Sequence, residues 1–510
     1  MLFRSILSNE RFDRQIRLWG VHGQQDICAS ELVIVGSDCL ASEILKNLTL
    51  HGIVNVTIVD DAILTKEDIG RNFFVGEQFL GKPRAEAVAH YLMELNPDIK
   101  VTTILKGSDD LSFIDDVKAN EDLFVITTGF KKTKYLKKLS DICREKKIRN
   151  AHIQIAGFIG GFYLDGGLHH YYEGTSGDED PALVFELRIL NPFPELQKFF
   201  DSFDFENLST EDHAHIPYPV ILNRAAKKYM EEKHIDKLSY DDESGLIDMI
   251  NRISKETPGR IEIAFEEARN KVKFILREEN IPNSIRECKE ISDKVGEVHE
   301  PFWEMFRATE RFCKKHGVAP HYGGCPDMNT TSDFYNQLKE IYKNKSKEDW
   351  NEVRKDLEEH CVNIDDKLFD RFRRCILSIN GYQYSPVSEM IDRFSLSFYS
   401  EETFCLRTVQ LLLIIAREFY DETNKLPMKG DKDKLLQMMC EKGADKSKVE
   451  KFVEEFCRYE GGYIPSVAGS LAAVLSEEIT KIIIHQVCPT TGIVIYDGIH
   501  TYFNRSEERR

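Results

Sequence analysis

A strand–helix–strand pattern near the N-terminus restricts the fold of this chain more than any other feature. Residues 32–36 form an apolar run that ends in Gly36, residues 40–50 carry apolar side chains at helical spacing, and residues 54–60 form a second apolar run. Three such segments within about 30 residues indicate a βαβ unit. Because the two strands of such a unit are parallel, the pattern predicts an α/β domain with a mostly parallel sheet.

The same alternation continues to about residue 165 and then stops. Further strand-like runs lie at 101–105, 123–127 and 152–155, and helix-like runs at 84–95 and 135–145. Residues 166–455 are charged and mostly helical in pattern, and residues 456–510 contain one helix from Pro465 and a hairpin around Asp497. One helix and a hairpin cannot form a domain. We therefore expect a first domain over 1–165, an inserted helical domain over 166–455, and a return to the first domain over 456–510.

The loop between the first strand and the first helix departs from the phosphate-binding pattern. A nucleotide fingerprint has Gly-x-Gly-x-x-Gly there and an acidic residue about 20 positions later. This chain has Gly36, Asp38 and Ala41, followed by Asp60 or Asp61 at the end of the second strand. Asp38 places a negative charge where a pyrophosphate would lie, and it can cap the helix instead. We expect a βαβ unit that is kept for its fold and does not bind a nucleotide.

Charge and cysteine spacing exclude several other classes of function. The formal net charge of −18 opposes binding to nucleic acids and anionic membranes, and no apolar run is long enough for a membrane helix. The 12 cysteines include no Cys-x-x-Cys pair, and residues 1–10 do not form a secretory signal. Reduced thiols in a cytoplasmic and/or nuclear protein are therefore expected. His213 and His215 lack a third ligand at zinc spacing, so we expect no metal site.

Several motifs resemble the adenylation domains of the ubiquitin-activating-enzyme family. The motifs are Arg-Phe-Asp-Arg-Gln-Ile-Arg-Leu-Trp-Gly at 11–20, and the segments 44–48, 68–74 and 81–87. The resemblance implies a Rossmann-like adenylation fold of the ThiF type with a large helical insertion. Active members carry a lysine where this chain has Arg84, and a magnesium-binding Asp after the strand that here ends in Thr128-Gly129. These departures imply that the chain binds neither ATP nor magnesium.

The rest of the chain resembles one branch of that family, the regulatory subunits of heterodimeric neddylation-activating enzymes, also described as the amyloid-precursor-binding type. Its motifs lie at 193–196, 211–215, 302–303, 326–328 and 455–459. The branch implies a catalytic partner subunit that binds ATP and Mg²⁺ and carries the thioester cysteine. It also implies a Nedd/Rub-type ubiquitin-like protein as substrate.

The resemblance also assigns roles to individual residues. Arg14, in Asp13-Arg14-Gln15, is implied to reach across the dimer to the ATP of the other subunit. The segment 325–342 is implied to contact the catalytic subunit, although an apolar stripe of this kind is more often core. The expected contact residues in this segment are Pro326, Asp327, Met328, Phe334 and Leu338.

Three alternative functions remain open from the sequence. The equivalent subunit of the SUMO-activating enzyme has a smaller helical middle than the one expected here. A nicotinamide-dependent oxidoreductase requires the missing second and third glycines. An autonomous adenylating homodimer requires the missing lysine and magnesium ligand. Cys325-Pro326 and Cys488-Pro489-Thr490 are the nearest local matches to a catalytic-cysteine motif, but non-catalytic cysteines are the preferred interpretation.

Overall fold

The computed structural model describes residues 10–505 apart from 108, 118–119, 121, 173–186, 257–260, 277–279, 297–298, 394–403, 491 and 500–501. The first nine residues, where no secretory signal is predicted, lie outside the described part. The chain divides into two units. The first comprises Met1–Tyr171 and Tyr382–Arg510, and the second comprises Tyr172–Gly381. No described helix combines the length and the apolar character that crossing a membrane would need.

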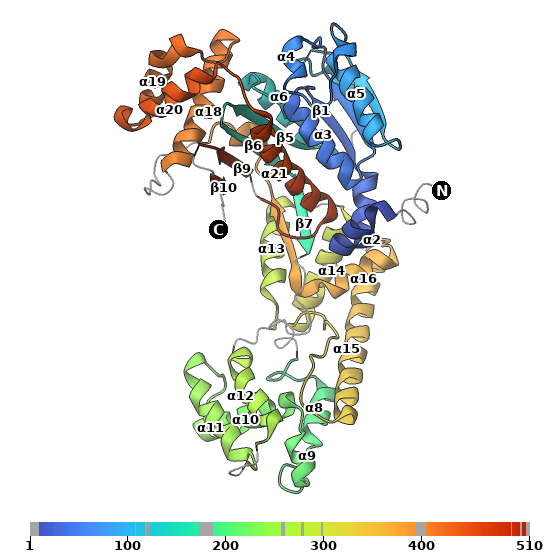
Figure 1. The fold of residues 1–510 in the computed structure, drawn as a ribbon. Helices are drawn as coiled ribbons and strands as arrows, with labels where there is room; N and C mark the ends of the chain where they lie inside the picture. Colours follow the sequence, from blue (N-terminus) through green and yellow to red (C-terminus); the bar gives the residue numbers. More distant parts are fainter. Residues whose placement is uncertain are drawn as a thin grey trace. The chain divides into compact units, whose positions relative to one another are not determined.

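An eight-stranded sheet forms the centre of the first unit (Figure 1), in the order β10-β9-β6-β5-β4-β1-β2-β3. Strands β3, β2, β1, β4 and β5 are parallel, whereas β6, β9 and β10 add an antiparallel edge. The predicted α/β class with a mostly parallel sheet is therefore confirmed. The strands are β1 (Glu31–Val35), β2 (Asn55–Val59), β3 (Lys100–Ile104), β4 (Leu123–Thr128), β5 (Arg149–Ala156), β6 (Ile159–Asp165), β9 (Gly492–Asp497) and β10 (Tyr502–Arg505).

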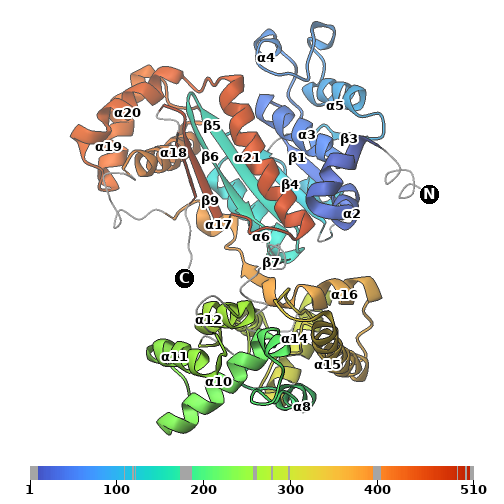
Figure 2. The ribbon, with the colours of Figure 1, turned by 60° about the horizontal axis from the view of Figure 1, so that its bottom comes forward.

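Helices cover both faces of this sheet because successive strand residues point to opposite sides. Leu32 and Ile34 lie in one core, and Val33 and Val35 lie in the other. Figure 2 shows α21 lying across the first face. The helices of the first face are α2 (Asp13–Ala29), α3 (Cys39–His51), α5 (Arg84–Leu95) and α21 (Pro465–Ile484); those of the second are α6 (Thr133–Glu145), α17 (Val387–Met390) and α18 (Phe404–Thr423).

The C-terminal residues complete the first unit. Strand β9 pairs with β6, and α21 packs on α3. The first unit, however, resumes at Tyr382 rather than near residue 456, because α18, α19 (Lys432–Glu441) and α20 (Lys446–Tyr459) share a core with the sheet. The predicted boundary at 455 therefore moves to 381, and the one at 165 moves to 171. A charged, helical sequence pattern does not show whether a helix covers a sheet or belongs to a separate domain.

The second unit is helical and has its own core, which includes Tyr218, Leu222, Phe265 and Tyr342. Its helices are α8 (Pro194–Asp201), α9 (Thr210–Ala214), α10 (Tyr218–Lys233), α11 (Glu243–Ile253), α12 (Ile263–Ile275), α13 (Asn283–Val295), α14 (Pro301–His316), α15 (Ser332–Glu359) and α16 (Asp366–Arg374).

The remaining elements are short. Strands β7 (Leu168–Tyr172) and β8 (Ile379–Gln383) pair with each other. The short helix α4 (Lys66–Ile69) precedes α5, and 3₁₀ turns lie at Glu10–Phe12, Glu77–Phe79, Ser112–Asp115, Tyr240–Asp242, Ile376–Ser378 and Lys429–Asp431.

Candidate functional site

The candidate site lies where the fold would hold a nucleotide, at the carboxyl end of β1. In open α/β sheets, ligands bind outside the carboxyl ends of the strands, where the strand order reverses. Here the order reverses between β1 and β4. Gly36, with a φ of +117°, follows β1, and a Cβ at this position would lie 2.3 Å from Thr128 Oγ1. The one glycine left in the loop is therefore required by the packing of the fold itself.

Asp38 occupies the N-terminus of α3. It is the N-cap residue, and its Oδ1 accepts a hydrogen bond of 2.9 Å from the backbone N–H of Ala41. Ala41 itself is fully buried. A helix N-terminus attracts anions because its first N–H groups have no partner within the helix. The Asp38 carboxylate therefore takes the position that a phosphate group would take.

Arg84, the first residue of α5, ties together three segments around this loop. Its Nη2 lies 2.9 Å from Asp60 Oδ2, its Nη1 lies 3.0 Å from Asp68 Oδ1, and its Nε donates to Ser37 Oγ at 3.1 Å. The Ser37 hydroxyl also donates to Asp60. We call these four residues the Arg84 cluster. The guanidinium uses its planar fork on protein groups, in the way arginine commonly binds phosphates.

The charges within the Arg84 cluster stabilise one another. Burial raises the pKa of Asp60, but Arg84 and Ser37 outweigh that effect, so the pKa lies below its usual value. Burial likewise opposes ionisation of Asp68, yet hydrogen bonds from Thr65 and the charge of Arg84 lower its pKa overall. Burial would lower the pKa of Arg84, and the nearby Asp60 and Asp38 raise it instead. The cluster is therefore ionised and paired at neutral pH.

A cation also lies three residues beyond the end of β4, the strand after which the resemblance implies a magnesium-binding Asp in active members. Strand β4 ends at Thr128 without a carboxylate, and Lys131 follows with only 7% of its surface exposed. Burial lowers the pKa of Lys131, against the opposing charges of Asp109, Asp38 and Asp60. Magnesium requires oxygen ligands, mostly carboxylates and waters. An ammonium group among the local carboxylates does not fit such a site.

The residues present therefore do not fit an ATP–Mg²⁺ complex. Phosphate oxygens would meet the carboxylate of Asp38, and like charges about 4 Å apart repel by roughly 1 kcal/mol even in water. Arg84 is engaged with protein carboxylates. The structure brings together all the predicted loop residues, Gly36, Asp38, Ala41, Asp60 and Arg84, in an arrangement that needs no ligand.

Three members of this region were not predicted from the sequence, namely Ser37, Asp68 and Lys131. Asp68 could have been found, because Thr65 and Asp68 have the spacing of a capping box. In the structure, Asp68 Oδ2 accepts hydrogen bonds of 2.9 Å from both the backbone N–H and the hydroxyl of Thr65. Ser37 and Lys131 carry no local signal. Their roles depend on Asp60, which is 23 residues from Ser37 in the sequence.

Arg14 has a different environment from Arg84. It lies in the first turn of α2 and is exposed. Its neighbour Asp13 forms an ion pair of 2.8 Å with Arg17 instead. Within the described part of the chain, Arg14 has no ion-pair partner. The guanidinium of Arg14 is therefore available to a group outside this chain.

The residues expected to contact a partner subunit are mostly buried within the second unit. Leu338 is fully buried and Met328 is 9% exposed, and both belong to the core of that unit. Phe334 packs edge-on against Phe203 with ring centroids 4.9 Å apart. Pro326 is also buried, whereas Asp327 is exposed. The prediction is therefore corrected for Pro326, Met328 and Leu338, which are buried inside this unit. Only Leu338 lies on α15, where helical spacing marks the face packed on the core; Pro326 and Met328 precede that helix.

The cysteine and histidine candidates are buried or form hydrogen bonds within the chain. Burial raises the pKa of Cys325 to about 12, which disfavours its thiolate. All twelve cysteines are free, and Cys488 donates to the Pro489 carbonyl at 3.4 Å. His213 is buried 2.8 Å from Glu262, whereas His215 bonds to the Glu211 carbonyl. The described residues contain no group of three metal-type ligands.

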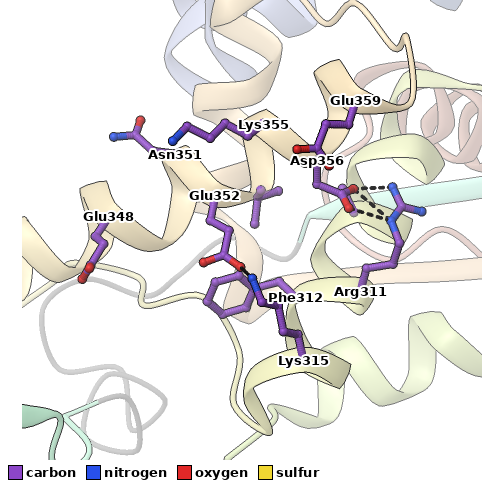
Figure 3. Close-up of a pocket in the computed structure, with 11 residues that line it drawn as sticks. Arg311, Phe312, Lys315, Glu348, Asn351, Glu352, Lys355, Asp356 and Glu359 are labelled. Atoms are coloured by element: carbon purple, nitrogen blue, oxygen red, sulfur yellow. Dashed lines mark hydrogen bonds and ion pairs between the residues drawn. The ribbon is translucent and has the colours of Figure 1, made fainter.

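A pocket of about 690 Å³ lies between α14 and α15 in the second unit (Figure 3). Buried Ala308, Phe312 and Val353 lie among its lining residues. Arg311 forms three hydrogen bonds with Asp356, two of them from Nε at 2.9 and 3.0 Å, and Lys315 lies 2.7 Å from Glu352 (Figure 3). Because these charges pair across the pocket, they hold α14 to α15.

Comparison with known proteins places these features in a family context. Residues 12–170 match the ThiF family. The NEDD8-activating enzyme E1 regulatory subunit of Gallus gallus is 26% identical over 528 residues, covering 97% of this chain and 97% of that protein. The regulatory subunit AXR1 of Arabidopsis thaliana is 26% identical over 525 residues, covering 96% of this chain and 94% of that protein.

The SUMO alternative matches a smaller part of the chain. SUMO-activating enzyme subunit 1 of Dictyostelium discoideum is 28% identical over 243 residues, which cover 47% of this chain and 69% of that protein. The resemblance found in the sequence motifs is confirmed. The chain is similar, over nearly its full length, to the regulatory subunits of NEDD8-activating enzymes, and its residues 12–170 match the ThiF family.

Proposed function

We propose that this chain is the regulatory, non-catalytic subunit of a heterodimeric NEDD8-activating enzyme. It supports ATP-dependent adenylation of a Nedd/Rub-type ubiquitin-like protein, and thioester formation, on a catalytic partner subunit. The observation that carries this proposal is the closure of its own phosphate loop. Asp38 caps α3, and Arg84 is held by Asp60 and Asp68. A phosphate loop whose charged groups are paired within the protein fits a subunit that does not catalyse the reaction itself.

The partner subunit supplies what this chain lacks. In this proposal it binds ATP and Mg²⁺ and carries the nucleophilic cysteine. Exposed Arg14 contributes to that site in trans, where a guanidinium can bind two phosphate oxygens and neutralise their charge. Asp327 and Phe334 stay candidates for contact with the catalytic subunit. The twelve free cysteines support a cytoplasmic and/or nuclear location, where thiols are kept reduced.

The test measures ATP–pyrophosphate exchange that depends on a ubiquitin-like protein of the NEDD8 type. Three samples are compared, namely this chain alone, the co-purified catalytic subunit alone, and the complex. We expect exchange by the complex and none by this chain. A thiol-sensitive, ATP-dependent adduct should form on the catalytic subunit and on no cysteine here. Exchange by this chain alone, or an adduct on it, would refute the non-catalytic assignment.

A further inference from the structure

The most basic segment of this acidic protein surrounds α6. Residues 131–149 contain nine lysines and arginines and only two acidic residues, whereas the whole chain has a formal net charge of −18. Five of the eight residues in 131–138 are lysines. Such segregation of charge creates a local positive potential, which raises the encounter rate with negatively charged partners.

A hollow of about 720 Å³ lies over the first turns of α6, within the first unit. It is lined by Lys132, Thr133, Lys134, Lys137, Lys138, Asp141 and Asp421. The Asp421 carboxylate, from the end of α18, accepts the Thr133 backbone N–H at 2.8 Å. The N-terminus of α6 is therefore already capped from within the protein. Lys137 is also paired, with Asp392.

Three lysines of the hollow, Lys132, Lys134 and Lys138, form no ion pair with a described residue, and two of them are exposed. Lys134 and Lys138 are exposed, and neither forms an ion pair with a described residue. They lie four residues apart on α6, so they share one face of the helix and repel each other. An anion bound between them would relieve that repulsion. The carboxylates already recruited to Thr133 and Lys137 show that this part of α6 pairs with acidic side chains from other segments.

We propose that this hollow binds an extended, acidic peptide segment of a partner protein. On a helix, side chains four apart have Cβ atoms about 5–6 Å apart. In an extended chain, alternate side chains share a face and lie about 6.6 Å apart. Carboxylates at alternate positions therefore match Lys134 and Lys138, whereas a single phosphate spans a shorter distance. The proposal is independent of the proposed function, because it involves neither the Arg84 cluster nor Arg14.

The experiment measures binding of a fluorescent 12-residue peptide of alternating glutamate and serine to the full-length chain. We expect the double variant Lys134→Glu/Lys138→Glu to weaken binding at least tenfold. The milder Lys134→Gln/Lys138→Gln should weaken it less, and circular dichroism checks that both variants are folded. The matched control is Lys347→Glu/Lys451→Glu, which makes the same change in net charge at two exposed lysines that have no ion pair within the described structure. The control should bind the peptide as the wild type does.

Three results would overturn the proposal. The first is no binding of the glutamate peptide at millimolar concentration and low salt. The second is an equal loss of affinity in the control variant, which would indicate a general charge effect. The third is displacement of the peptide by tripolyphosphate or by a single-stranded oligonucleotide at lower concentration than by unlabelled peptide, which would assign the hollow to phosphate groups.

Discussion

Charged side chains near neighbouring strand ends of the same sheet differ in whether they have ion-pair partners within the protein. Beyond β1 and β2, Arg84 is matched inside the protein by Asp60 and Asp68. Beyond β4, the chain leads into α6, where Lys134 and Lys138 remain exposed and unmatched within the described structure. Both lie at the edge where α/β folds bind ligands. The position of a site in the fold therefore does not decide its role. A better indication is whether its charged side chains are paired within the protein.

The two arginines of the family motifs extend this comparison. In the resemblance, Arg84 replaces a lysine of the adenylating family and Arg14 keeps its arginine, but Arg84 is enclosed by two carboxylates and Arg14 is exposed. Removing each one should therefore affect a different property. Loss of Arg84 should lower stability, whereas loss of Arg14 should lower activity of the complex.

The largest effect is expected for Arg84→Ala. This change leaves the Asp60 carboxylate buried without its main partner, and breaking such pairs costs about 3–5 kcal/mol of unfolding free energy. Urea denaturation measures it, with hydrogen exchange in β1 and β2 to localise the change. Arg71→Ala is the control, because Arg71 is partly exposed and lies 3.8 Å from Glu67. It should cost about 1 kcal/mol or less. Similar losses for both variants would contradict a special role for the Arg84 cluster.

A smaller effect, on rate rather than stability, is expected for Arg14→Ala in the reconstituted heterodimer. A hydrogen bond to a charged group contributes about 1.5–3 kcal/mol, so adenylate formation should slow by about 10- to 100-fold. Arg17→Ala is the matched control, because Arg17 lies on the same helix but is paired with Asp13. Single-turnover adenylation at limiting ATP measures the rates, and gel filtration checks subunit association. Equal rates for the wild type and Arg14→Ala would remove Arg14 from the proposed site.

The smallest effect is expected on stability when the pH is lowered. The pKa values of Asp60 and Asp68 are lowered in the folded protein, so their stabilising contribution is present above the unfolded value of about 3.9. It is lost as the pH falls through the folded pKa values. Between pH 5 and pH 3, the urea midpoint of the wild type should fall more steeply than that of Arg84→Ala. Parallel curves would show that Arg84 does not set the ionisation of these two carboxylates.

Strands β1, β4 and β5 were predictable from the sequence because they are buried along almost their whole length and appear as apolar runs. Strand β6 was not, since Gly160 and Gly161 weaken its pattern. Both glycines are explained by close backbone contacts, because a Cβ on Gly160 would lie 2.8 Å from the Gln154 carbonyl and one on Gly161 2.7 Å from the Val494 carbonyl. The Gly161 contact depends on β9, a distant segment of the chain, and leaves no local signal.

In the candidate site, the sequence could predict only interactions that depend on one residue and its immediate neighbours. Asp38 could be expected to cap α3, because Asp is a preferred N-cap residue, and the structure shows that bond. The partners of Arg84 could not be inferred, since they come from positions 24 and 16 residues away. For Leu338, helical spacing identified an apolar face but could not distinguish a core from an interface.

The pairing of β6 with β9 has a consequence for synthesis of the protein. Strand β6 ends at Asp165 and β9 begins at Gly492, so about 330 residues must be translated before this pair can form. At roughly 5–20 residues per second, the wait is about 15–65 s. During this time the β6 edge of the nascent sheet has no native partner strand, and an unpaired edge can pair with other chains. The sheet is therefore completed only late in synthesis, after β9 has been translated.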